Sequence, residues 1–350
     1  MSQAGFSIII CTHNGIGRLE PTLAHIAALE VPVGTSVELI VVDNASTDHT
    51  NHFTREVWKK LGAPFSLVVL NEKKPGKGYA VETGYDAAQF SYILTVDDDN
   101  WLQADYLTQA LQLLQKDPSI GVLQGHSSGV FEVPPPPWVH NLKQFFIIGG
   151  PKEKIGYFPQ NDFSVWGAGM LIRRSDWLYL RNLGYASLTS KLPGKAAGED
   201  NELAIGLLLL GRKIYYSDRL QYKHFMPRDR VNWEKLKKNF ETFGYVHYYF
   251  FLYSVVINSY YEGKSITIRS IRKDFFPYWL KYLKSYTLKQ QIAYFLFPKH
   301  ESYQLHLLYY YAEFKWFWKL HKAAIKDIKF LQSWVLPLLK SDNNSFQWPL

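Results

Sequence analysis

Short apolar runs alternate with helical patterns over the first hundred residues of this 350-residue chain. Helical spacing of apolar residues follows each of the first three runs and ends near residues 27, 61 and 90. Such repeated alternation predicts βαβ units and an α/β fold, with a mostly parallel sheet covered on both faces. The continuous runs, typical of buried parallel strands, are Phe6–Cys11, Val37–Val42, Ser66–Leu70 and Tyr92–Val96.

The alternation becomes less regular after residue 100. We expect a helix over Ala104–Lys116, and further strands over Ile120–Gln124, Ser164–Arg174 and Ile214–Asp218. Residues 126–163 form a long irregular stretch with four consecutive prolines, which is typical of a lid or binding loop. Beyond residue 230 the pattern is helical, with helices expected over residues 232–259, 266–285, 288–297 and 302–336.

The fourth apolar run ends in three consecutive carboxylates, Asp97, Asp98 and Asp99. In open α/β sheets ligands bind outside the carboxyl ends of the strands, so these acids are expected at the mouth of a cleft. Adjacent carboxylates repel by about 4 kcal/mol at 4 Å and an effective dielectric of about 20, and a hard divalent cation relieves this. The cluster therefore indicates a site for Mg²⁺ or Mn²⁺ and a diphosphate. An acidic turn capping the following helix is the alternative.

Other strand ends carry polar groups suited to the same ligand. Asp43 can accept a hydrogen bond from a base or ribose, or cap the next helix. Lys73 and Lys77 lie in a glycine-containing loop that can approach phosphate, or can be an ordinary solvated turn. The glycines of Gly167-Ala168-Gly169 allow a close approach of backbone to substrate, or mark a bulge.

Two further candidates lie later in the chain. Glu199 and Asp200 begin an apolar helix, where acids pair favourably with the helix dipole. An ionised Asp200 could instead take the proton of an attacking hydroxyl group. His224 is a candidate metal ligand or a structural histidine near a domain junction.

The charge distribution divides the chain in two. Residues 1–220 hold 19 Lys and Arg against 22 Asp and Glu, whereas residues 221–350 hold 20 against 9. We therefore expect domains over residues 1–230 and 231–350. The single cysteine, Cys11, and an N-terminus without secretory character indicate a reducing, cytoplasmic compartment. No apolar run approaches the ~20 residues of a membrane span.

The ordered motifs resemble family 2 glycosyltransferases of the GT-A fold. The segments that carry the resemblance are Phe6–Asn14, Val37–Asp48, Gly76–Gly84, Asp97–Asp99, Gly167–Met170 and Glu199-Asp200. The resemblance implies that Asp97-x-Asp99 is a DxD motif, with Asp97 and Asp98 by ribose and phosphate and Asp99 at the metal. It also implies that Asp43, Thr12, His13 and Asn14 surround the nucleotide base.

The same likeness makes Asp200 the candidate base of an inverting transfer from a nucleotide-diphosphate sugar. The HFMPRDR segment, which starts at His224, resembles cell-surface polysaccharide transferases. The Gln-x-x-Arg-Trp motif and the membrane helices of processive synthases are absent from this sequence. This disfavours a role like that of cellulose or hyaluronan synthases.

The C-terminal region has a basic and an aromatic side. Lysines 315, 319, 322, 326 and 329 are spaced to form one stripe on a single helix, beside apolar residues that include Phe317, Ile328 and Leu331. This pattern suits the inner face of an anionic membrane and a glycan or lipid-linked acceptor, or a helix packed on the catalytic domain. No nucleic-acid-binding motif is present.

Two alternatives to a transferase stay open at this point. A non-catalytic glycan or lipid-carrier binding protein could use the same fold, although intact acids at both sites argue against it. A nucleotidyltransferase would need a richer glycine loop than Asn14-Gly15-Ile16-Gly17. The sequence names neither the sugar, the base, the acceptor nor the oligomeric state.

Overall fold

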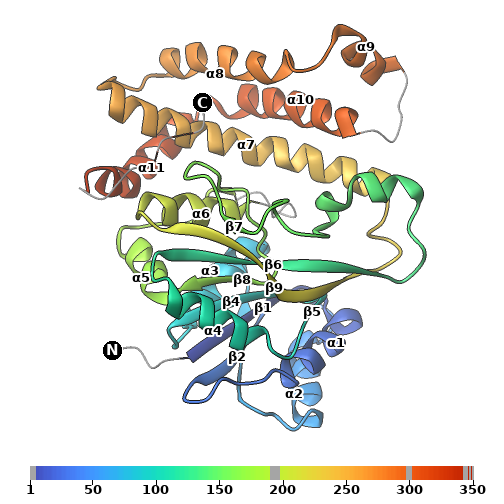
Figure 1. Cartoon of the computed structure of the whole chain (residues 1–350). Coiled ribbons are helices and arrows are strands. Elements are labelled where there is room, and N and C mark those ends of the chain that lie inside the picture. The colour runs from blue at the N-terminus through green and yellow to red at the C-terminus, as the bar shows by residue number, and fades with distance from the viewer. Residues whose placement is uncertain (1–4, 190–197, 297–301, 342–345, 347, 349–350) are drawn as a thin grey trace.

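The computed structural model describes residues 5–189, 198–296, 302–341, 346 and 348. A central sheet carries helices on both faces, and a further group of helices lies over one side (Figure 1). The strands are β1 (Gly5–Thr12), β2 (Ser36–Asn44), β3 (Ser66–Glu72), β4 (Tyr92–Asp97), β5 (Asn100–Leu102), β6 (Ile120–Phe131), β7 (Gly156–Tyr157), β8 (Met170–Arg173) and β9 (Lys213–Met226).

The helices divide between the sheet region and the C-terminal region. Those of the sheet region are α1 (Ile16–Ala27), α2 (Thr50–Lys60), α3 (Lys77–Ala87), α4 (Tyr106–Lys116), α5 (Arg174–Asn182), α6 (Glu199–Leu209) and the short 3-10 helices Pro137–Asn141 and Lys143–Phe146. Those of the C-terminal region are α7 (Trp233–Glu262), α8 (Ile268–Leu283), α9 (Leu288–Leu296), α10 (Ser302–Leu320) and α11 (Ala324–Leu339).

The sheet has the order β3-β2-β1-β4-β8-β6-β9-β5, and β7 pairs with β9. The long ladders β1–β2, β1–β4, β2–β3 and β6–β9 are parallel, whereas the shorter pairings of β8, β5 and β7 are antiparallel. The predicted mostly parallel α/β sheet is therefore confirmed.

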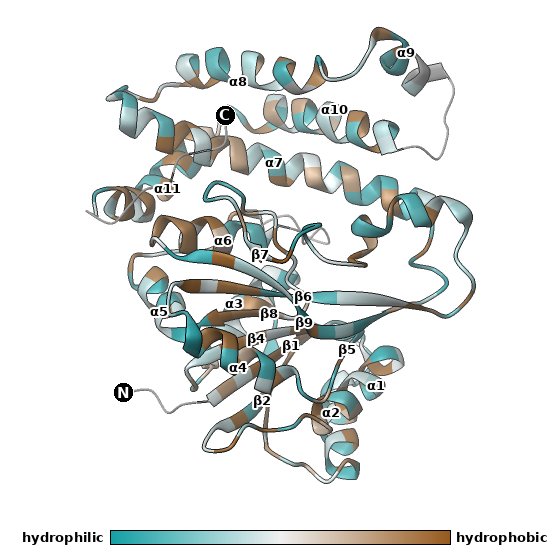
Figure 2. Ribbon diagram, in the orientation of Figure 1, coloured by the Kyte–Doolittle hydropathy of each residue, from teal (hydrophilic) through white to brown (hydrophobic). Residues whose placement is uncertain are grey.

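Both faces of the sheet are buried, as the continuous apolar runs predicted. Along β1, Ile8 and Ile10 pack in one hydrophobic cluster with α1, α2 and α4, whereas Ile9 packs in the other. This alternation follows from the two-residue period of a strand. Figure 2 shows hydrophobic residues concentrated in the strands and in α6.

The second half of the sheet region differs from the prediction in the bounds of three strands and in one additional helix. β6 continues to Phe131 and β9 continues to Met226, because the two strands pair with each other over residues that alternate less clearly. The strand expected over Ser164–Arg174 begins only at Met170, and α5 was not predicted. Backbone pairing between distant segments decided these boundaries, and a local pattern does not record it.

The last predicted helix is two helices. α10 ends at Leu320 and α11 begins at Ala324, so the five lysines do not form a stripe on one helix, and that prediction is wrong. His321, in the break, is buried and its Nε2 lies 2.6 Å from Nη2 of Arg272. The inward position of this side chain accompanies the change in helix direction. The predicted helix over residues 288–297 is α9, and residue 297 lies outside the described residues.

The apolar side of α10 and α11 packs against the rest of the protein. Phe317, Ile328 and Leu331 are buried in the same cluster as α6 and α7. The described helices include none that is both long and apolar enough to cross a bilayer. β9 ends and α7 begins on either side of the boundary predicted at residue 230, yet this cluster joins both parts. The domain division stays a prediction.

Candidate active site

The strand register brings the polar strand ends to one edge of the sheet. Cys11 of β1 lies opposite Asp97 of β4, and Thr12 lies opposite Asp43 of β2. Asp43 in turn lies opposite Asn71 of β3. Because these strands are parallel, their carboxyl ends form a continuous polar rim.

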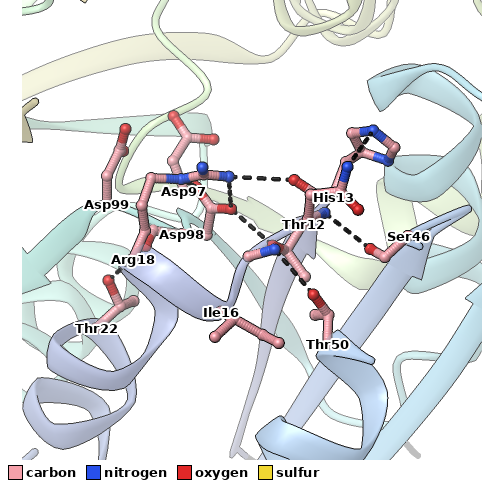
Figure 3. A network of polar contacts seen from close by, with 12 residues as sticks. Thr12, His13, Ile16, Arg18, Thr22, Ser46, Thr50, Asp97, Asp98 and Asp99 are labelled. Atoms are coloured by element: carbon pink, nitrogen blue, oxygen red, sulfur yellow. Dashed lines mark hydrogen bonds and ion pairs between the residues drawn. The ribbon is translucent and has the colours of Figure 1, made fainter. Parts of the chain in front are cut away.

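Each of the three consecutive carboxylates contacts a different cation of the protein. Lys77 Nζ lies 2.6 Å from Asp97 Oδ1, and Arg18 Nη2 lies 2.8 Å from Asp98 Oδ2 (Figure 3). Arg230 forms an ion pair with Asp99. The repulsion predicted between these acids is thus relieved within the chain. The three cations come from α1, α3 and the segment that precedes α7.

Burial and pairing act in opposite directions on these acids. Burial raises the pKa of Asp98, and the hydrogen bond from Arg18 opposes this effect. Burial also acts to raise the pKa of Asp99, but the neighbouring His224 ring and Arg230 outweigh it and lower that pKa to about 2. Asp99 is therefore ionised at neutral pH.

Asp99 and His224 adjoin in the buried interior of the site. His224 Nε2 lies 3.4 Å from Asp99 Oδ1, and neither ring nitrogen of His224 has a hydrogen-bond partner. The ionised carboxylate is a ligand type that suits Mn²⁺ or Mg²⁺, and the buried imidazole without a hydrogen bond can add a nitrogen ligand for a transition metal such as Mn²⁺. Within the described ranges, no three His, Cys, Asp or Glu side chains gather as a metal site. Asp97 is instead held by Lys77, so a cation here would need further ligands from a substrate.

The end of β1 and the loop after it are held in place by the segments that follow β2 and β4. Thr12 Oγ1 donates to Asp98 Oδ2 at 2.6 Å, and His13 Nδ1 lies 2.8 Å from the Asn44 carbonyl oxygen. Asn14 has a positive φ of 52°, and its backbone N–H donates to Ser46 Oγ (Figure 3). The side chains of His13 and Asn14 are exposed at this rim, whereas Thr12 is buried.

Asp43 is almost fully buried at the end of β2. Its Oδ1 accepts a hydrogen bond from the backbone N–H of Ser46, at 3.1 Å. This contact is a turn-stabilising bond of the kind considered as the alternative for this residue. The second carboxylate oxygen leaves acceptor capacity for a ligand.

Lys77 connects the two acidic clusters. Its Nζ contacts Asp97 and also lies 3.9 Å from Glu199 Oε1. Burial acts to lower the pKa of Lys77, but the charges of Asp97 and Glu199 outweigh it and raise that pKa. The Asp97–Asp99 cluster and the Glu199-Asp200 pair therefore adjoin through Lys77, and Lys77, Glu199 and Asp200 line one cavity. Lys73, the other candidate in this loop, is exposed.

Asp200 is positioned by backbone amides at the start of α6. Its Oδ2 accepts from the Gly167 N–H at 2.7 Å, and its Oδ1 accepts from the Asn201 N–H at 2.8 Å. Burial first, and then the charge of Glu199, raise the pKa of Asp200 to about 7. A carboxylate with this pKa is a stronger base than an ordinary aspartate.

The Gly167-Ala168-Gly169 segment supports Asp200 and the sheet. Gly167 supplies the amide described above, and Ala168 is buried in the core. Gly169 has a φ of +66°, and an added Cβ would lie 2.7 Å from the Tyr106 hydroxyl oxygen. Its backbone conformation and the packing of Tyr106 therefore account for this glycine within the protein.

Two cations of the site were not predicted. Arg18 lies on α1, and nothing in the local pattern distinguishes it from other exposed helix residues. Arg230 stands in the HFMPRDR segment, where the sequence assigned it no role. The signal for these arginines is the run of three carboxylates at one strand end, because buried acids need cations close to them.

Comparison with known proteins supports the resemblance of this chain to family 2 glycosyltransferases. The profile of the family described as Glycosyl transferase family 2 matches residues 7–178. Poly-beta-1,6-N-acetyl-D-glucosamine synthase of Staphylococcus epidermidis is 25% identical over 122 residues, which are 35% of this chain and 28% of that protein. The same-named enzyme of Staphylococcus aureus strain MSSA476 matches to the same extent. The match thus spans less than a third of these relatives.

Solved structures show a weaker likeness. Staphylococcus aureus TarS 1–349 in complex with UDP-GlcNAc has a TM-score of 0.48 and 17% identity, covering 69% of this chain and 65% of that one. GalNAc-T7 with UDP, GalNAc and Mn²⁺ has a TM-score of 0.48 and 15% identity, covering 69% and 47%. From the matched profile and the mostly parallel α/β sheet, we conclude that the chain carries a glycosyl transferase family 2 domain of the GT-A fold class in residues 7–178.

Proposed function

We propose that the protein is a metal-dependent, inverting glycosyltransferase that transfers a sugar from a nucleotide-diphosphate sugar to a hydroxyl group of a glycan or lipid-linked acceptor. The observation that carries this proposal is the position of Lys77 between Asp97 and Glu199. Through these two contacts Lys77 links the acids proposed to bind the donor with the pair that contains the proposed base, which supports a single reaction centre.

Asp200 is the proposed general base. It takes the proton of the acceptor hydroxyl as the acceptor oxygen forms a bond to the anomeric carbon. The bond from that carbon to the diphosphate oxygen breaks on the opposite face, so the anomeric configuration inverts. The pKa of about 7 suits this step, because about half of the carboxyl groups are ionised at neutral pH and the carboxylate is basic enough to accept a proton.

The cations of the site are proposed to stabilise the leaving diphosphate. Lys77 and Arg230 each contact an acid at the cleft and can turn toward the developing negative charge. Asp99 and His224 would hold Mn²⁺ or Mg²⁺, with Asp97 as a further candidate ligand. A bound divalent ion would neutralise phosphate charge and polarise the bond to the leaving group.

The rim around β1 and β2 is proposed to bind the nucleotide. Asp43, Thr12, His13 and Asn14 lie at adjoining strand ends, where a base and ribose can be accommodated. Lys73 lies exposed in the neighbouring loop, within the segment proposed to approach phosphate. Because the curated relatives are N-acetylglucosamine polymer synthases, UDP-GlcNAc is the first sugar nucleotide to test, followed by other UDP-, GDP- and dTDP-sugars.

The decisive experiment combines binding and turnover. Nucleotide diphosphates and their sugars are screened by thermal shift with Mn²⁺ and again with EDTA, since a ligand that binds the folded form raises its melting temperature. Donor turnover is then measured as release of the nucleotide diphosphate. We expect Asp200→Asn to keep the thermal shift while turnover falls by about 10²- to 10⁴-fold.

The matched control is Asp218→Asn, which changes an exposed carboxylate of β9. It should retain both binding and turnover. Normal turnover by Asp200→Asn would remove the assignment of the base. If EDTA leaves the thermal shift unchanged, the proposed metal dependence of donor binding is wrong.

We also propose that the protein works at the cytoplasmic face of an anionic membrane, in the assembly of a surface polysaccharide. α8 and α9 lie at the outer edge of the C-terminal group of helices (Figure 1). Residues 264–296 hold seven Lys and Arg against one acidic residue. Six large hydrophobic side chains are exposed in or near this segment, and we name them the outer apolar face: Ile268, Phe276, Leu280, Leu288, Ile292 and Trp318. Exposed apolar side chains among basic residues suit a layer of anionic headgroups.

A further inference from the structure

Two adjoining hollows extend from Asp200 into the C-terminal helices. The first, of about 590 Å³, is lined in part by Lys77, Glu199 and Asp200. The second, of about 370 Å³, lies between α7 and α10. We call the two together the acceptor cavity. Residues that line both hollows are Phe145, Gly198, Asn201, Phe243, His247, Phe250 and Tyr309.

The far wall of this cavity comes from the C-terminal region. Phe243, His247 and Phe250 lie at positions i, i+4 and i+7 of α7, so they share one face of that helix. Tyr309 of α10 lies beside them, with its ring neighbour His247 at a centroid distance of 4.9 Å. The start of α6 therefore supplies the acids of the cavity, and α7 and α10 supply its aromatic wall.

Charge restricts what the acceptor cavity can hold. Among the described residues that line it, the charged side chains are Lys77, Glu199 and Asp200. Lys77 lies next to Asp97, where the leaving diphosphate is proposed to bind, and the other charged groups of the described lining, Glu199 and Asp200, would repel a further anion on the acceptor. A phosphate or carboxylate group is therefore poorly accommodated, and a neutral ligand is favoured.

The cavity also places polar groups among its aromatic rings. His247 is held by Glu313, whose Oε1 lies 2.8 Å from His247 Nδ1, and Glu313 is fully buried. The Tyr278 hydroxyl lies 3.2 Å from the same ring. Gln144 and Ser164 add side-chain hydrogen-bonding groups to the lining. A fixed imidazole, an amide and a hydroxyl next to aromatic faces match the hydroxyl groups and C–H faces of a pyranose ring.

We propose that the acceptor cavity binds a neutral oligosaccharide, with its terminal sugar against the rings of α7 and α10 and its attacking hydroxyl at Asp200. This inference rests on the proposed transferase function and specifies its acceptor. A lipid carrier, if one is attached to this glycan, lies outside the cavity.

The test uses the full chain and an array of neutral oligosaccharides, followed by calorimetric titration of those that bind. Phe243→Leu keeps most of the volume of a half-buried side chain but removes its ring. We expect this variant to bind the oligosaccharide at least tenfold more weakly and to raise the KM for it, while the thermal shift with the nucleotide diphosphate stays unchanged. His247→Gln provides a second variant, with the same expectation. Tyr179→Ala, at an exposed position of α5, is the control and should bind as the wild type does.

Several outcomes would overturn the inference. They are an array without any bound oligosaccharide, equal affinity of wild type and both variants, and polyprenyl phosphate in detergent as the single acceptor that stimulates nucleotide release. The proposed function fails in a different way, because then no sugar nucleotide shifts the melting temperature or is turned over. A chain that turns over a donor but binds no neutral glycan refutes this inference alone.

Discussion

The sheet edge and the C-terminal helices contribute different kinds of side chains to the candidate site. At the sheet edge, charged side chains meet in pairs, as in Asp97 with Lys77 and Asp98 with Arg18. In the helices, aromatic rings meet, as in Tyr253 of α7 with Trp334 of α11 at a centroid distance of 5.8 Å. The first region is suited to binding phosphate groups, and the second is suited to recognising a ligand by its shape.

This difference indicates which proposed function belongs to each region. Strand ends fix the acids with little freedom, because backbone ladders set their positions. The helices are joined to that frame at α6, where the Tyr253 hydroxyl donates to Glu202 Oε1 at 2.8 Å. A change at the sheet edge should therefore affect chemistry, and a change at the helices should affect acceptor choice, location or stability.

The largest expected effect comes from breaking the contact between the two acidic clusters. Lys77→Met leaves Asp97 and Glu199 without their cation, and removes a group proposed to stabilise the leaving diphosphate. We expect donor turnover to fall by roughly 10²-fold or more and the free energy of unfolding to fall by about 1–3 kcal/mol. Turnover assays and thermal unfolding measure the two effects.

The matched variant Lys73→Met separates the two lysines of this loop. Lys73 is exposed, so its loss should leave stability unchanged and reduce turnover far less. Equal losses in both variants would contradict the special position of Lys77.

The pH dependence of turnover is the next largest effect. Burial raises the pKa of Asp200 to about 7, so the proton stays on this carboxyl group at pH values where an exposed aspartate has lost it. Since a base must be ionised, turnover should rise about tenfold per pH unit below 7 and level off above it. A rate profile from pH 4.5 to 8.5 checks this. An acid limb near pH 4 would show that Asp200 is either exposed or not the base.

Membrane association tests the outer apolar face. We expect the wild type to sediment with phosphatidylglycerol vesicles and not with phosphatidylcholine vesicles, because anionic lipid attracts the basic residues around this face. The double change Phe276→Ser and Leu280→Ser should weaken binding by roughly tenfold, since it removes two exposed apolar side chains. Val33→Ser is the control, because Val33 is exposed in the segment between α1 and β2, outside the outer apolar face. If the double variant and the Val33→Ser control sediment equally with the vesicles, the outer apolar face does not bind the membrane.

The smallest effect is expected at the contact between α7 and α6. Tyr253→Phe removes one hydrogen bond to the buried Glu202 and should lower the free energy of unfolding by about 1–2 kcal/mol. Thermal denaturation beside Tyr179→Phe, an exposed tyrosine, measures it. No change in melting temperature would mean that the aromatic packing alone joins the helices to the sheet region.

The sequence by itself determined the first half of the fold and the identity of its acids. Continuous apolar runs such as Phe6–Cys11 predicted buried parallel strands, because a strand covered on both faces needs apolar residues at every position. Parallel strands then place their carboxyl ends at one edge, so the sequence was enough to assign Asp43 and Asp97 to the same edge of the sheet. The order of the motifs was enough to indicate the family.

Only the tertiary structure decided which cation meets which acid and what faces Asp200. Arg230 is 131 residues from Asp99, and α10 lies still further along the chain. The break at His321 and the extension of β6 along β9 likewise depend on neighbours that are distant in sequence. Local periodicity records which face of an element is apolar, but it does not record which other element covers that face. For this reason the aromatic wall of the acceptor cavity, which combines residues of α7 and α10, could not be predicted from the sequence.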